Sequence, residues 1–162
     1  MDGFAGDDTI NGLGADDFIF GRAGDDIIDG GDGDDIMAGG TGDDTLSGGS
    51  GSDIMTGGLG DDTLNGESGN DVMMGGSGDD TLDGGLGNDL IVGDLGNDTI
   101  IASAGTDQIR FGYGDGNDTY GGRASYADDD VFVFEEGIEA DDIWFGRLDN
   151  DLLVRLHGAE DS

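Results

Sequence analysis

The sequence contains no cysteine, no proline and no lysine, and each absence limits what the chain can do. Without cysteine it has neither a disulfide framework nor a thiolate metal site. Five arginines face 39 acidic residues, so the formal charge is −34. A chain this acidic is repelled by nucleic acid and by anionic membrane surfaces. No apolar run approaches the length of a transmembrane helix.

Glycine and aspartate are abundant, and they recur in a nine-residue unit that runs without insertion from residue 3 to residue 110. The consensus of the unit is Gly, any, any, Gly, any, Asp, any, aliphatic, any. Position eight is Ile, Leu or Met in all twelve copies. Such a composition is otherwise typical of disorder, but a disordered linker has no reason to keep an aliphatic residue at every ninth position. Position six is always aspartate: Asp8, Asp17, Asp26, Asp35, Asp44, Asp53, Asp62, Asp71, Asp80, Asp89, Asp98 and Asp107.

One unit is too short to bury its own aliphatic side chain, so neighbouring units must stack. Residues 45–47 are predicted to form a three-residue strand with Leu46 pointing inward, and the six residues before them a tight turn. The outward position seven is mostly threonine in odd-numbered copies and mostly apolar in even-numbered copies. We therefore predict an all-β fold, a right-handed parallel β-roll with two strands and two turns in each coil of 18 residues.

The aspartates of such a roll stack along its two edges, where their carboxylates repel one another. Calcium takes six to eight oxygens from carboxylates and backbone carbonyls, and a glycine-rich turn that ends in aspartate offers both. Zinc and copper prefer histidine and thiolate ligands, and the sequence offers one histidine, His157, and no cysteine. Magnesium is the weaker candidate because it prefers rigid octahedral sites. The pattern therefore favours calcium.

The repeat Gly-Gly-x-Gly-x-Asp-x-aliphatic-x resembles that of the RTX (haemolysin-type calcium-binding) family over residues 3–110. The resemblance implies one Ca²⁺ between each turn and the turn 18 residues later, about ten ions in all. The first turn would supply the backbone oxygens of positions two and four, the second those of positions one and three, and each turn its aspartate. One implied site consists of Gly40, Gly42 and Asp44 with Gly57, Leu59 and Asp62, and the next of Gly49, Gly51 and Asp53 with Gly66, Ser68 and Asp71. The other implied ligands are Asp118, Gly6, Gly24, Gly33, Gly60, Gly69, Gly75, Ser77, Gly78, Gly84, Leu86, Gly87, Gly93, Leu95 and Gly96.

The resemblance also implies a function and a location. Proteins of the family leave Gram-negative bacteria unfolded by type I secretion, so we expect a secreted segment that is disordered without calcium, folds on extracellular calcium and stabilises its parent protein. No signal peptide precedes the array, so we expect a piece of a longer protein, with any secretion signal beyond residue 162.

Two alternatives stay open. The segment could be the RTX region of an extracellular adhesin or ice-binding protein, although Ile27 interrupts the threonine ladder that ice binding would need. It could also be the non-catalytic folding module of a secreted protease, lipase or epimerase. The chain itself is expected not to be an enzyme, because no nucleophile elbow with a histidine partner is present.

Residues 111–162 are predicted to be a last imperfect repeat followed by a β-rich cap, which a solenoid needs to cover its final coil. Residues 111–120 fit a thirteenth copy after a two-residue slip, with Asp118 at position six and Tyr120 inward. Residues 131–134 alternate like a strand, and residues 143–145 and 152–156 are predicted to form a hairpin that turns at residues 149–150. Residues 128–130 are expected to be a solvated loop, with a further calcium contact as the alternative. The segment from residue 134 to residue 156 resembles the one that follows many RTX arrays.

The outward side chains of the even-numbered copies form an apolar ribbon. Contiguous exposed apolar patches usually mark an interface. We therefore expect this face to pack against another copy of the chain, the tail or the rest of the parent protein. The residues of the ribbon are Phe18, Phe20, Ile36, Ile54, Val72, Met74, Leu90 and Val92.

Overall fold

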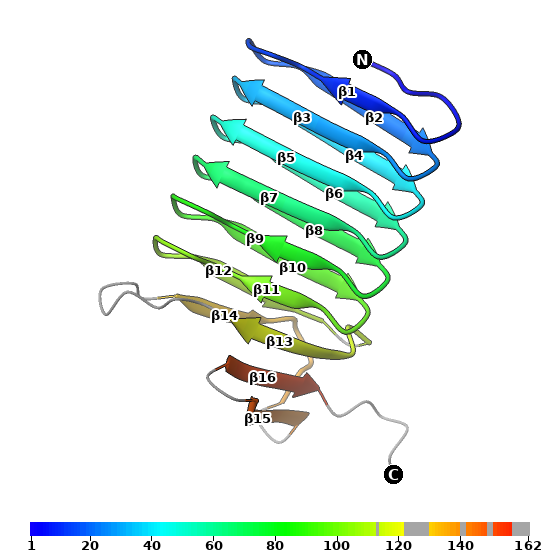
Figure 1. Cartoon of the computed structure of the whole chain (residues 1–162). Coiled ribbons are helices and arrows are strands. Elements are labelled where there is room, and N and C mark those ends of the chain that lie inside the picture. The colour runs from blue at the N-terminus through cyan, green and yellow to red at the C-terminus, as the bar shows by residue number, and fades with distance from the viewer. Residues whose placement is uncertain (113, 122–129, 140–141, 149–150, 157–162) are drawn as a thin grey trace.

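The chain winds as a solenoid in which successive strands alternate between two facing sheets (Figure 1). The computed structural model describes residues 1–112, 114–121, 130–139, 142–148 and 151–156. Paired strands of the array run parallel, and partners lie 18 residues apart, as Leu46 and Leu64 do. The predicted parallel β-roll and its 18-residue coil are therefore confirmed. Within the described ranges, no helix has the length and apolar character to cross a membrane.

One sheet, the odd sheet, holds the strands that begin in odd-numbered copies and has nine strands. Its parallel part extends from the first coil to the end of the array. Two antiparallel strands of the tail complete it. In spatial order the strands are β1 (Thr9–Asn11), β3 (Ile27–Asp32), β5 (Thr45–Ser50), β7 (Thr63–Ser68), β9 (Thr81–Asp83), β11 (Thr99–Ile101), β13 (Asn117–Gly121), β16 (Asp151–Leu156) and β15 (Ile143–Leu148).

The other sheet, the even sheet, has seven strands that are all parallel. Its outer face carries the apolar ribbon. In spatial order the strands are β2 (Phe18–Ala23), β4 (Ile36–Thr41), β6 (Ile54–Leu59), β8 (Val72–Ser77), β10 (Leu90–Leu95), β12 (Gln108–Phe111) and β14 (Val131–Phe134).

The predicted strand length was wrong for most of the array. Strand β5 runs over six residues, from Thr45 to Ser50, and therefore includes positions one to three of the next copy. Those glycine-rich positions pair in register with the neighbouring coil, as Gly49 does with Gly31. A positive φ at position two, 102° at Gly49, does not interrupt the pairing. After the six-residue strands each turn is consequently only three residues long and consists of positions four to six, whereas β1, β9 and β11 keep the predicted three-residue length.

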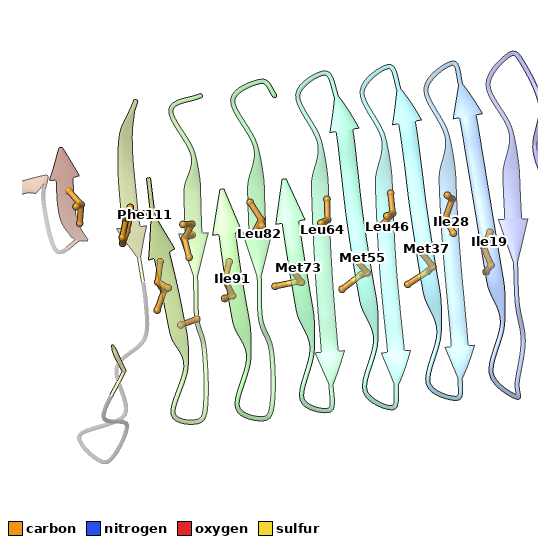
Figure 2. Close-up of a cluster of buried hydrophobic side chains, with 14 residues drawn as sticks. Ile19, Ile28, Met37, Leu46, Met55, Leu64, Met73, Leu82, Ile91 and Phe111 are labelled. Atoms are coloured by element: carbon orange, nitrogen blue, oxygen red, sulfur yellow. The ribbon is translucent and has the colours of Figure 1, made fainter. Parts of the chain in front are cut away.

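The core is a double column of position-eight side chains between the sheets (Figure 2). Leu46, Leu64 and Leu82 come from the odd sheet, and Met37, Met55 and Met73 come from the even sheet. Each of them is at most 1% exposed. Position one, which also points inward, is glycine almost throughout, so the interior holds one large side chain per strand.

The tail continues both sheets at the C-terminal end of the roll (Figure 1). Tyr120 pairs with Ile100, 20 residues earlier, so β13 joins the stack after the two-residue slip. The antiparallel strand β16 then pairs with β13 and ends the parallel order. Phe111 stacks on Phe132 and Phe134, with ring centroids 5.9 and 5.5 Å apart, so aromatic side chains fill the final coil.

The strand at residues 131–134 and the antiparallel pair β15–β16 lie where the sequence predicted them. The predicted hairpin turn at Asp149 and Asn150 lies outside the described residues, as do His157 and the loop residues Asp128 and Asp129.

Candidate metal centre

The position-six aspartates form two ladders along the edges of the roll, one in the turns of the odd-numbered copies (the odd edge) and one in the turns of the even-numbered copies (the even edge). In each ladder the Oδ1 atom accepts the backbone N–H of the aspartate one coil earlier, as Asp44 Oδ1 does from Asp26 at 2.8 Å. The odd-edge pairs are Asp8–Asp26, Asp26–Asp44, Asp44–Asp62, Asp62–Asp80, Asp80–Asp98 and Asp98–Asp118. The even-edge pairs are Asp17–Asp35, Asp35–Asp53, Asp53–Asp71, Asp71–Asp89, Asp89–Asp107 and Asp107–Asp130.

In ten of these aspartates the second carboxylate oxygen is buried, with no hydrogen-bond donor among the residues that the structure describes. From Asp26 to Asp107 each residue is at most 2% exposed. A buried charged group with an unsatisfied oxygen is strongly unfavourable unless a cation or a proton compensates it. The Oδ2 atoms concerned are those of Asp8, Asp26, Asp35, Asp44, Asp53, Asp62, Asp71, Asp80, Asp89 and Asp98.

The glycine at position one makes room for this oxygen. A Cβ atom placed on Gly48 would lie 2.5 Å from Asp53 Oδ2 and 2.9 Å from the carbonyl oxygen of Gly66. A Cβ atom on Gly84 would meet Asp89 Oδ2 at 2.5 Å and the Ala102 carbonyl at 2.9 Å. The carboxylate therefore shares a small cradle with a position-one carbonyl of the following coil.

Positions two and four have positive φ throughout the array, whether or not they are glycine. The six residues other than glycine at position two have φ between 64° and 84°, the region that L-residues tolerate best among positive values. Glycines at position four reach 152° at Gly69. This backbone conformation sets the direction of the turn carbonyls, and it explains why glycine recurs at these positions. The residues other than glycine at position two are Phe4, Leu13, Arg22, Glu67, Asp94 and Ser103.

The position-three carbonyls that the resemblance implies as ligands already accept one hydrogen bond. Leu59 accepts the Gly42 N–H at 2.8 Å, and Ser68 accepts the Gly51 N–H at 3.0 Å. A carbonyl oxygen has two lone pairs, so each can still bind a cation. The same pattern holds for Ser77, Leu86 and Leu95.

Burial raises the pKa of several ladder carboxyls in the middle and later coils, because their charged form loses its hydration. The pKa of Asp62, Asp89, Asp98 and Asp118 rises to about 7. The backbone N–H of the preceding coil opposes this rise, and neighbouring carboxylates add to it. The pKa of Asp71 and Asp80 rises to about 6 for the same reasons. Above about pH 7 these carboxyls lose their protons, and the buried charge of the metal-free ladders then needs a cation to compensate it.

The donor set fits a hard cation. Within the described ranges, no three acidic, histidine or cysteine side chains converge in a way that could hold a metal ion alone. A cation at the ladder must therefore combine carboxylate oxygens with backbone carbonyls. Calcium accepts that mixture and tolerates irregular geometry.

Two parts of the hydrogen-bonded ladders at the edges were not predicted from the sequence. Asp130 was expected in a solvated loop, but its Oδ1 accepts the Asp107 N–H at 3.1 Å, so it continues the even ladder. The hydroxyl of Tyr120 donates to Asp130 Oδ2. The signal in the sequence was the two-residue spacing between Asp130 and Phe132. It equals the spacing between positions six and eight of the repeat, and Phe132 pairs with the position-eight residue Ile109.

Position five was treated as variable, yet it forms a second ladder at each edge. Its side-chain oxygen accepts the N–H of position five in the following coil, as Asp43 does from Asp61 at 2.9 Å. The enrichment of Asp and Asn at this position was the signal that could have revealed it.

Comparison with known families supports the assignment of a cation-binding array. The model of the RTX calcium-binding nonapeptide repeat matches in four copies, over residues 2–37, 29–64, 38–73 and 74–109. A search of curated proteins found no match.

Proposed function

The chain belongs to the family of RTX calcium-binding nonapeptide repeats, and on that premise we propose that at neutral pH its calcium-binding β-roll folds only when calcium fills the edges. The observation that carries the proposal is the row of buried Oδ2 atoms that find no donor within the described part of the chain. Each is held in a cradle that a Cβ atom would fill, and in most cradles a backbone carbonyl of the following coil lies beside it. Without a cation these carboxylates oppose the stacking that buries the core.

Calcium binding can supply the missing stability. A ligand that binds only the folded state adds RT ln(1 + [L]/Kd) per site, about 1.4 kcal/mol at a concentration tenfold above Kd. About ten sites would then add on the order of 14 kcal/mol, comparable with the whole stability of a typical domain. About ten ions would also reduce the formal charge from −34 to about −14.

The same dependence suits a protein that must stay unfolded before export. Sites of the extracellular class have Kd values of about 10⁻⁴–10⁻³ M and stay empty in the cytosol. We propose that the segment is secreted from a Gram-negative bacterium by type I secretion and then stabilises its parent protein without being catalytic. A parent that is an adhesin, or a protease, lipase or epimerase, is compatible with this role.

A calcium titration followed by far-UV circular dichroism tests the proposal. We expect a coil-like spectrum after calcium depletion at neutral pH, and a cooperative transition to β-structure near millimolar calcium. The same concentrations of magnesium, at matched ionic strength, should leave the spectrum coil-like. A β-spectrum in the calcium-depleted chain would contradict the proposal, because the core and the tail would then suffice for folding.

The outward apolar face of the even sheet supports a second proposal, that the calcium-loaded segment binds another copy of itself or its parent protein. Phe18 is 61% exposed, and Phe20 and Ile54 are each 41% exposed. We expect sedimentation velocity to show self-association in calcium, and the double variant Phe18→Ser and Ile54→Ser to abolish it. The control variant Thr45→Ser on the odd sheet should associate as the wild type does. A wild-type chain that stays monomeric at all concentrations would exclude the second copy as the partner.

A further inference from the structure

The position-five ladders differ in charge between the two edges, although their geometry is the same. On the odd edge, Asp43 accepts the backbone N–H of Asp61 at 2.9 Å, and Asp61 accepts that of Asp79 at 2.8 Å. On the even edge, Asn70 accepts the N–H of Asn88 at 2.8 Å, and Asn88 that of Thr106 at 2.9 Å. The amide oxygen thus replaces the carboxylate oxygen in the same hydrogen bond, and only the charge changes.

The change of charge follows a clear pattern along the chain. The odd edge carries aspartate at position five in its first five turns: Asp7, Asp25, Asp43, Asp61 and Asp79. The even edge carries aspartate only in its first two turns, at Asp16 and Asp34. Its later turns carry the neutral residues Ser52, Asn70, Asn88 and Thr106.

The position-five side chain lies beside a backbone carbonyl of the candidate site. A Cβ atom placed on Gly60 would lie 2.6 Å from the carbonyl carbon of Gly42 and 2.9 Å from Asp43 Oδ1. On the even edge, a Cβ atom on Gly87 would lie 2.6 Å from the Gly69 carbonyl carbon and 3.3 Å from Asn70 Oδ1. The same neighbourhood of the site therefore holds a carboxylate on one edge and an amide on the other.

The charge balance of the two edges follows from these ladders. In the arrangement that the family resemblance implies, each position-six aspartate would be shared between two adjacent sites, so each Ca²⁺ would be matched by one of these aspartates. Where position five is aspartate, a second carboxylate per coil completes the neutralisation of the ion. Where it is Ser, Asn or Thr, every filled site leaves one uncompensated positive charge, and these charges repeat at the strand spacing of about 4.8 Å. Affinity for calcium rises with the number of charged groups around the ion.

We propose that the two edges form two classes of calcium site, a tight class along the odd edge from Asp8 to Asp80 and a weak class along the even edge from Asp53 to Asp107. The proposal rests on the proposed function, since it concerns the same ladders. Position five thereby determines the strength of each site without supplying a ligand. The tight class is expected to fill at about tenfold lower calcium than the weak class.

The test measures bound against free calcium at fixed ionic strength, with circular dichroism on the same samples. The wild-type chain should bind calcium in two phases. The variant Asp43→Asn, Asp61→Asn and Asp79→Asn keeps each hydrogen-bond acceptor and should move the tight phase to about tenfold higher calcium, without moving the weak one. The variant Ser52→Asp, Asn70→Asp and Asn88→Asp should move the weak phase toward the tight one.

A third variant separates local charge from net charge. Asp29→Asn, Glu136→Gln and Glu139→Gln lie outside the turns of the array, on β3 and in the tail, and change the net charge by the same amount. It should leave both phases in place. A single phase in the wild type, or equal shifts in the first and third variants, would overturn the proposal while leaving calcium-driven folding intact. Loss of calcium-dependent folding altogether would instead overturn the proposed function.

Discussion

Calcium-depleted protein transferred from about pH 8 to about pH 5 is expected to fold into the same roll that it forms with calcium at neutral pH. The reason is that protonation removes the ladder charge that calcium otherwise neutralises. Burial raises the pKa of Asp62 from its ordinary value of 3.8 to about 7. It raises the pKa of Asp89 and Asp98 to about 7 as well.

The direction of the effect follows from proton linkage. A group whose pKa is higher in the folded state binds protons more tightly there, so protons stabilise the fold. The contribution of Asp62 is complete below its unfolded value of 3.8 and is lost as the pH rises through about 7. The metal-free roll should therefore lose stability steadily between about pH 4 and pH 7.

Circular dichroism against pH, with sedimentation on the same samples to exclude aggregates near the pI of about 4.1, checks this expectation. The double variant Asp62→Asn and Asp80→Asn mimics the protonated ladder, so its metal-free form should stay folded to higher pH than the wild type. The control, Asp61→Asn and Asp79→Asn, changes exposed residues of the same two turns and should shift the transition less. A soluble, coil-like wild type at about pH 5 would contradict the argument.

Substitution of alanine for Gly69 should break the calcium-loaded roll in its middle. A Cβ atom there would overlap the carbonyl oxygen of Gly51 and lie 2.5 Å from its carbonyl carbon, and both are backbone atoms of the adjacent coil. The φ of Gly69 is 152°, outside the region that alanine tolerates. The coils cannot separate locally without losing the ladder bonds on both sides. We expect a loss of more than about 4 kcal/mol in urea unfolding of the calcium-loaded protein.

Gly6 provides a matched control for this substitution. It occupies the same position of the repeat, also with positive φ (102°), but a Cβ atom there would meet nothing within 4 Å. Gly6→Ala should therefore cost only the strain of a left-handed alanine, about 1–2 kcal/mol. The natural alanine at this position, Ala15, likewise lies in the first turn of its edge and has a φ of 83°. Equal losses for the two variants would show that backbone strain, and not contact between coils, decides the role of glycine at position four.

The fold could be predicted from the sequence because one periodicity specifies it. An aliphatic residue at every ninth position required stacking, and the alternation of position seven between threonine and apolar residues separated the two sheets. The strand length could not be predicted in the same way. Gly48 and Gly49 have no side chain that signals a strand, and they extend β5 only because the adjacent coils supply pairing partners.

The site could be predicted as far as the aspartate pattern reached. The position-six residues can be identified from the sequence because they are aspartate in every copy of the array. Asp130 was missed because 23 residues separate it from Asp107, so its place in the ladder depends on how the intervening chain is accommodated. The role of position five was missed because Asp, Asn and Ser can each accept the same backbone hydrogen bond there. No single residue type is therefore repeated at this position, and the pattern looks variable.

The uniform spacing of the coils leaves the stack with nearly equivalent alternative alignments. A displacement by one whole coil would place Leu64 where Leu46 lies, and Thr63 where Thr45 lies. Most local contacts would survive it, so the array carries little information about which coil belongs beside which. That information is concentrated where the periodicity ends. The last coil differs from the others by the two-residue offset before Asp118 and by the aromatic side chains around Phe132. It can therefore pair with only one neighbour, and this pairing fixes the alignment of all the coils before it.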